Sequence, residues 1–70
     1  MKDLTGTMVY DSWGNEGHGL LGMVVGRKLG SKFDEWRVEW YHKHHVMRTA
    51  MSRGSLQIFI IDYQKIKKNI

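Results

Sequence analysis

The sequence predicts an all-β protein, a small five-stranded barrel, and two neighbouring segments near its middle carry this prediction. In one segment, Trp36, Val38 and Trp40 alternate with charged or polar residues, which is the period of a strand with one face on a core. The segment before it is rich in Val and Met and contains Gly22 and Gly26, where a strand can bend or let another backbone approach. Together the two segments are typical of the central hairpin of a small β-barrel.

The length of the chain predicts a single domain over 1–70, because 70 residues form at most one hydrophobic core. Residues 1–4 and 68–70 are expected to be loose ends. The chain has three Trp, three Tyr and two Phe, so a few large aromatic side chains are expected to close the small core. It has no Cys, which excludes a disulfide, a Cys-ligated zinc site and a thiol nucleophile.

Three strands are expected in the first part of the chain, at 7–10, 20–28 and 35–41. The glycine-rich segment 13–19 connects the first two, and a turn near Gly30 connects the next two. We interpret 13–19 as an ordinary loop and not as a phosphate-binding loop, because no Gly-Lys-Ser/Thr ending follows it.

The second part of the chain begins with a polar, basic segment, 42–55, which we interpret as a long excursion between strands three and four. One helical turn is expected within it, near 46–51. A fourth strand is predicted at 56–60 and a short 3₁₀ turn at 61–63. A fifth strand at 64–67 completes the barrel.

The main alternative for the last segment is a C-terminal helix over 55–67. Strands are favoured over this helix for two reasons. The run Ile58 to Ile61 is rich in β-branched residues, which favour strands, and no capping box precedes it.

Several motifs give the chain a resemblance to the small SH3-like β-barrel proteins of tailed bacteriophages, over roughly residues 5–67. These are Gly-Leu-Leu-Gly-Met-Val at 19–24, Trp-Arg-Val-Glu-Trp at 36–40 and Ile-Asp-Tyr-Gln-Lys-Ile at 61–66. The resemblance implies a phage-encoded, SH3-like barrel that is not an enzyme and that binds a partner. Related small barrels bind proteins, peptides or nucleic acids, so the fold alone does not choose among these partners.

Charge is distributed unevenly along the chain. Residues 1–41 carry five Lys/Arg and six Asp/Glu, whereas residues 42–70 carry six Lys/Arg and one acid, Asp62. We expect a protein-interaction or assembly module that binds a host or phage protein through a barrel face and the basic 42–55 loop. The alternative is nucleic-acid binding by the basic C-terminal half. The expected contact residues are Tyr10, Trp13, Tyr41, Lys43, His44, His45, Arg48 and Arg53.

Other functions have little support in the sequence. His42, His44 and His45 form a cluster, but a solvated basic loop is favoured over a metal site. No enzyme activity and no cofactor are expected, since neither Ser52 nor Ser55 lies in a nucleophile-elbow pattern. No apolar run approaches the ~20 residues that cross a bilayer. The expected location is the cytoplasm of the producing host cell, with virion association as an alternative, and the oligomeric state stays open.

Overall fold

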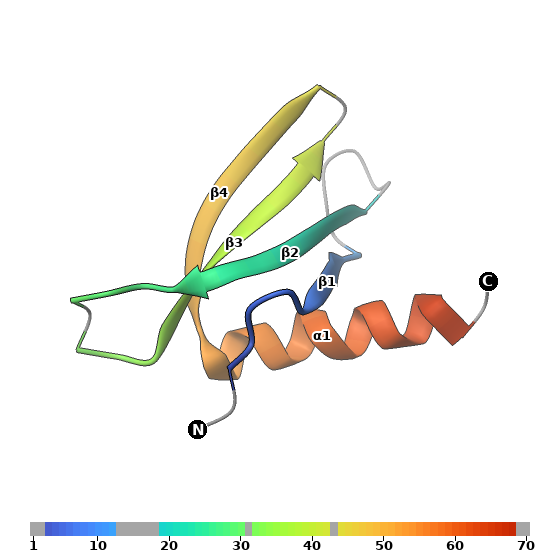
Figure 1. Ribbon diagram of the computed structural model, residues 1–70. Helices are drawn as coiled ribbons and strands as arrows, with labels where there is room; N and C mark the ends of the chain where they lie inside the picture. Colours follow the sequence, from blue (N-terminus) through green and yellow to red (C-terminus); the bar gives the residue numbers. More distant parts are fainter. Residues whose placement is uncertain (1–2, 13–18, 31, 43, 69–70) are drawn as a thin grey trace.

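The computed structural model of the protein describes residues 3–12, 19–30, 32–42 and 44–68. In this part of the chain, four antiparallel strands form one open sheet in the order β1-β2-β3-β4, and a C-terminal helix packs against one face of it (Figure 1). The elements are β1 (Met8–Asp11), β2 (Leu20–Arg27), β3 (Glu35–His42), β4 (His45–Ser52) and α1 (Arg53–Lys68).

The predicted five-stranded SH3-like barrel is therefore wrong, although its first three strands are confirmed within one residue at either end. The physical reason is the helix. Because α1 covers the apolar face of the sheet, the sheet does not need to close on itself to remove that face from water.

The predicted excursion at 42–55 is also wrong, because most of it is strand β4. This strand pairs with β3 without interruption, from Glu35 opposite Ser52 to His42 opposite His45. The expected helical turn near 46–51 is extended backbone instead. All of β4 except Met51 is exposed, so it lacks the alternation of buried and exposed residues that identifies β3 in the sequence.

The strands expected at 56–60 and 64–67, and the 3₁₀ turn expected at 61–63, are all replaced by α1. Leu56 is fully buried, and Phe59 and Ile60 pack beside it. Their spacing of three and four residues is that of one helix face. This periodicity outweighs the β-branched composition of the segment, because burying a helix face contributes more than local propensity.

Helix α1 also has a local start signal that is not a capping box. The hydroxyl of Ser52 accepts a hydrogen bond from the backbone N–H of Ser55 at 3.2 Å. This is the N-cap contact that satisfies one of the free N–H groups of the first turn. The basic residues of the last turn, Lys65, Lys67 and Lys68, lie at the negative end of the helix dipole.

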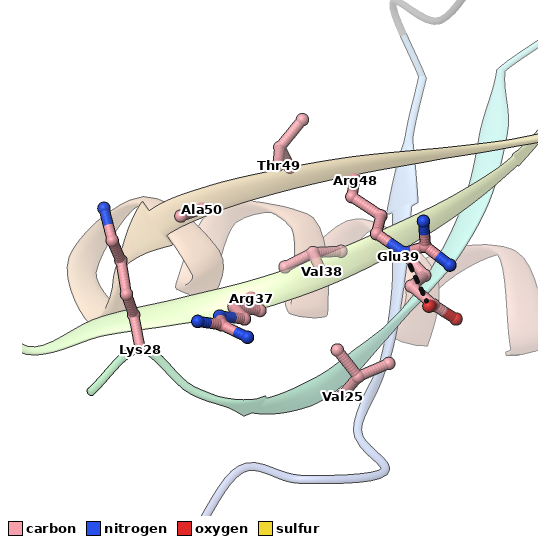
Figure 2. A pocket seen from close by; sticks show the side chains of 8 residues that line it. All are labelled: Val25, Lys28, Arg37, Val38, Glu39, Arg48, Thr49 and Ala50. Atoms are coloured by element: carbon pink, nitrogen blue, oxygen red, sulfur yellow. Dashed lines mark hydrogen bonds and ion pairs between the residues drawn. The ribbon is translucent and has the colours of Figure 1, made fainter.

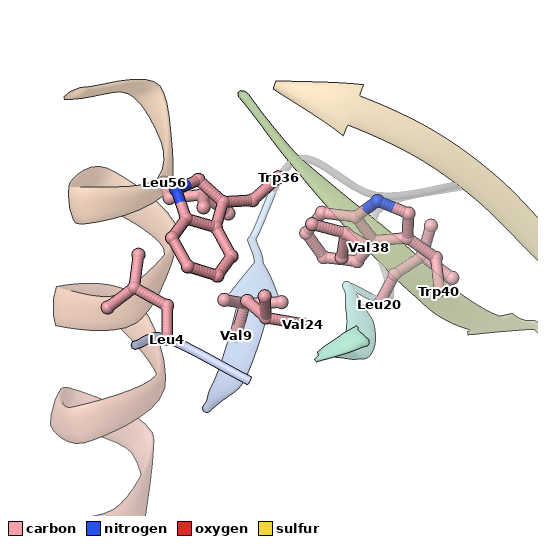
Figure 3. Close-up of a cluster of buried hydrophobic side chains, with 8 residues drawn as sticks. All are labelled: Leu4, Val9, Leu20, Val24, Trp36, Val38, Trp40 and Leu56. Atoms are coloured by element: carbon pink, nitrogen blue, oxygen red, sulfur yellow. The ribbon is translucent and has the colours of Figure 1, made fainter. Parts of the chain in front are cut away.

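The core lies between α1 and the facing side of the sheet (Figure 3). Its buried side chains are Leu4, Val9, Leu20, Val24, Trp36, Val38, Trp40 and Leu56. The predicted burial of both tryptophans is thus confirmed, while Leu4 is buried although residues 1–4 were expected to be loose. The ring of Phe59 meets Trp40 edge-on, with ring centroids 5.5 Å apart.

Both core tryptophans have a hydrogen-bond acceptor for the indole N–H. Trp36 Nε1 donates to Asp34 Oδ1 at 3.0 Å, and Trp40 Nε1 donates to Thr49 Oγ1 at 2.9 Å. Within the described ranges, every buried side-chain nitrogen or oxygen has a partner. The core therefore buries large aromatic groups without leaving a donor unpaired.

The close backbone approach predicted at Gly22 is confirmed. A Cβ atom at this position would lie 2.8 Å from the carbonyl oxygen of Glu39 and equally close to the ring of Trp40. A Cβ atom at Gly26 would meet no atom within 4 Å. The pairing of β2 with β3 shifts register between Val24 and Gly26, and an irregularity of this kind bends a strand. The two glycines therefore serve different purposes, close packing and strand bending.

Candidate functional site

The face of the sheet turned away from α1 has no element covering it in the described part of the chain (Figure 1). We call it the open face. Its residues are Met8, Tyr10, Leu21, Met23, Val25, Glu35, Arg37, Glu39, Tyr41, Val46, Arg48, Ala50 and Ser52. They belong to one face because directly paired residues of an antiparallel ladder share a face and successive residues alternate.

One row of the open face crosses all four strands. Tyr10 pairs with Leu21, Leu21 with Tyr41, and Tyr41 with Val46. Leu21, Tyr41 and Val46 are each more than 40% exposed, at 42%, 41% and 48%. Four apolar or aromatic side chains thus form a continuous, solvent-accessible strip at one end of the sheet.

The neighbouring row combines methionines with an ion pair. Met8 pairs with Met23, Met23 with Glu39, and Glu39 with Arg48. Arg48 Nε lies 3.2 Å from Glu39 Oε2, and the arginine side chain is 77% exposed. A surface pair of this kind contributes little to stability, typically about 0.2–1 kcal/mol. It does hold the Arg48 guanidinium over the sheet.

A groove of about 460 Å³ lies over β2, β3 and β4 (Figure 2). Its lining residues are Val25, Lys28, Arg37, Val38, Glu39, Arg48, Thr49 and Ala50. Three of them are basic and one is acidic, so the groove favours negative charge. Lys28 Nζ is 4.0 Å from Glu35 Oε1, whereas Arg37 makes no ion pair with any residue that the structure describes.

Of the residues expected to contact a partner, the structure brings Tyr10, Tyr41 and Arg48 together on the open face. His44 and His45 lie at the β3–β4 turn, at the end of the same hairpin. Trp13 and Lys43 lie outside the described residues.

Arg53 is separate from this group, because it is the first residue of α1 and faces Asp34. Its Nε donates to Asp34 Oδ2 at 2.5 Å, and its guanidinium lies 5.1 Å from the ring centroid of Trp36. The hydrogen bond from Arg53 lowers the pKa of the Asp34 carboxyl, and desolvation opposes this only in part. Arg53 therefore ties the start of the helix to the sheet.

Sequence reasoning missed several open-face residues, above all Arg37, Leu21 and Val25. The alternation that identified the core strand also contained the signal for Arg37, since a residue between two core positions of a strand must point away from the core. Leu21 and Val25 flank buried positions of β2 in the same way.

The remaining observations concern ligands and relatives. Among the described residues, no group of three or more His, Asp or Glu side chains is close enough to hold a metal ion. No helix among the described residues is both long enough and apolar enough to cross a membrane. Comparison with known proteins finds no matching family, no similar curated protein and no similar solved structure.

Proposed function

We propose that the protein is a non-enzymatic interaction module that binds a partner protein on the open face of its sheet. The observation that supports this most directly is the position of the exposed row from Tyr10 to Val46 next to the basic groove. One partner segment that covers both would bury apolar area and also meet cationic side chains.

The composition of the open face supports a protein partner. It contains two tyrosines, two methionines and two arginines, and its two acids each face a cation: Glu39 is paired with Arg48, and Glu35 lies 4.0 Å from Lys28. Tyr, Met and Arg are enriched in protein–protein interfaces, whereas acids and Lys are depleted there. Tyrosine gives a large, rigid contact area with a hydroxyl at its end, and arginine can bind a carboxylate through two hydrogen bonds.

The groove chemistry supports binding over catalysis. Its carboxylate, Glu39, is engaged by Arg48, and the hydroxyl of its lining residue Thr49 lies on the covered face of the sheet, where it accepts the indole N–H of Trp40. Neither group is therefore placed as a free base or nucleophile in this arrangement. The three cations suit an acidic segment of the partner.

The test is a comparison of captured partners between matched charge variants. Arg37→Glu reverses a charge in the groove, and Lys67→Glu makes the same change on the exposed surface of α1. The proteins that each variant captures are identified by mass spectrometry. Proteins captured specifically by the wild type are expected to be absent with Arg37→Glu and with Tyr41→Ala, but to be captured by Lys67→Glu. Identical captured sets for all variants would contradict the proposal.

Nucleic-acid binding is the second candidate, and the excess of cations in the groove favours it. Lys28, Arg37 and Arg48 line the groove, and Arg48 lies two residues along β4 from Val46, the partner of Tyr41, whose ring is a stacking surface of the kind used for single strands. In a mobility-shift assay with single-stranded DNA and RNA, such binding weakens steeply as salt increases, because phosphate contacts release counterions. Absence of any shift at low salt would remove this candidate.

A further inference from the structure

Strand β4 has a free edge along its whole length in the described part of the chain. There it is the last strand of the sheet, it pairs only with β3, and it runs for eight residues, His45–Ser52. The other edge strand, β1, has only four residues and packs against α1. The two edges thus differ in length and in cover.

One contact at the end of the β3–β4 ladder shows which backbone groups of β4 point toward the free edge. The backbone N–H of Arg53 donates to the carbonyl of Asp34 at 3.0 Å, which continues the register of β3 and β4 by one pair. Hydrogen-bonded pairs alternate along an antiparallel ladder. The backbone groups of Val46, Arg48 and Ala50 therefore point away from β3, toward the free edge.

The free edge also lacks the features that usually prevent strands from pairing. There is no proline in β4, its register with β3 is continuous without a bulge, and Arg48 is its one Lys or Arg. The guanidinium of Arg48 is paired with Glu39. Natural edge strands that must stay single are commonly short, bulged or more highly charged.

We infer that two copies of this chain pair antiparallel through β4, around a two-fold axis that passes beside Thr49. In this register Met47 lies opposite Met51 of the second copy, Arg48 lies opposite Ala50, and Val46 lies opposite Ser52. The result is a dimer with one continuous eight-stranded sheet. This inference goes beyond the proposed function and is independent of it.

Symmetry and the extent of pairing favour the registers centred on Arg48 or Thr49, the residues nearest the middle of His45–Ser52, and charge decides between these two. A two-fold axis perpendicular to the sheet keeps each copy's open face on the same side, so residues opposite each other must share a face. The register centred on Thr49 meets this condition and pairs the outward groups of Arg48 and Ala50 with each other. Centring the axis on Arg48 meets it too, but places two arginines directly opposite, which is unfavourable.

The dimer enlarges the binding surface. Because both open faces lie on the same side of the joined sheet, the two grooves lie on either side of the axis, with β4 of each copy between them. Both α1 helices lie on the other side. A partner with two binding segments gains from this arrangement, since the second contact becomes intramolecular.

The first test is the solution mass of the full chain as a function of concentration, by light scattering and sedimentation. The wild type is expected to reach the mass of two chains. Ala50→Pro removes an N–H from the free edge but none from the β3–β4 ladder, so it is expected to weaken dimerisation about tenfold or more, with a melting transition retained. Ile58→Lys, on an exposed position of α1, is the control and is expected to leave the dimer intact.

The second test fixes the register and remains informative if Ala50→Pro fails to fold. The chain has no native cysteine, so engineered ones report cleanly. Met47 and Met51 form a non-hydrogen-bonded pair across the dimer, where side chains are closest, and a chain with both as Cys is expected to cross-link under mild oxidation. Met47→Cys alone is the control, because its two copies lie about 13 Å apart along the strands.

A wild type that stays monomeric, together with a double-cysteine chain that does not cross-link, would overturn the inference. It would also be overturned by a dimer that survives in Ala50→Pro but is lost in Ile58→Lys, since the interface would then be the helix. Loss of the dimer in Ala50→Pro, together with cross-linking of the double-cysteine chain, supports it.

Discussion

The two faces of the sheet are built from the same strands but differ in burial and in composition. The face toward α1 carries Val9, Val24, Trp36, Val38 and Trp40, all buried. The open face takes the alternate positions and carries tyrosines, methionines and arginines, many of them exposed. In a sheet covered on one side only, alternate residues are thus divided between the core and the proposed binding surface, and a substitution tests one or the other.

The largest difference is expected between a core tryptophan and an open-face tyrosine. Trp36→Ala or Trp40→Ala leaves a cavity beneath α1 and an acceptor without its indole donor, and should destabilise the protein by about 3–5 kcal/mol. Tyr41→Ala, at a position 41% exposed, should destabilise it by about 1 kcal/mol or less. Urea denaturation of the three variants measures this. Similar losses for tryptophan and tyrosine would contradict the division between the faces.

A smaller loss is expected from a methyl group on the covered side of β2. Gly22→Ala would place its Cβ 2.8 Å from the carbonyl oxygen of Glu39, which does not move easily because it belongs to the ladder. Overpacking of this kind typically costs about 1–3 kcal/mol. Gly26→Ala is the matched control in the same strand, because nothing lies within 4 Å of the added Cβ. Equal melting temperatures for the two variants would show that the close approach at Gly22 has no energetic consequence.

The covered face was largely predictable from the sequence, and the reason is periodicity. Because alternate residues of β3 are buried, Trp36, Val38 and Trp40 alternate with polar residues in the sequence. This alternation predicts the strand, the face of it that is buried and the core residues that it contributes. Strand β4 has no such alternation in its sequence, because neither of its faces is buried. Its place in the sheet depends on pairing with β3, which a local pattern does not contain.

The C-terminal helix shows the opposite case, in which the signal was present but outweighed. Leu56, Phe59 and Ile60 have helical spacing, and Ser52 is an N-cap residue four positions before Leu56. The β-branched run suggested strands instead. For the candidate site, charge and aromatic content pointed to Tyr41 and Arg48, whereas the groove that joins Arg48 to Arg37 required the arrangement of β2, β3 and β4.

The smallest expected effect concerns the contact that joins the helix to the sheet, and it depends on pH. The hydrogen bond from Arg53, with further support from Trp36 and Arg27, lowers the pKa of Asp34 below its ordinary value. A carboxyl with a depressed folded-state pKa contributes stability that is fully present above its unfolded pKa of about 3.9 and is lost as the pH falls through the folded value. The contribution is modest, because the Asp34 and Arg53 side chains are about one quarter exposed, at 26% and 25%, and solvent weakens their attraction.

Asp34→Asn should therefore lower the stability slightly at neutral pH and flatten the decline of stability below pH ~4. Asp62→Asn removes a carboxylate of α1 that makes no ion pair with the described residues, so its acid profile should follow the wild type. Melting temperatures of the three proteins across the acid range decide the matter: if Asp34→Asn keeps the wild-type slope, the Arg53–Asp34 contact does not couple the position of α1 to pH.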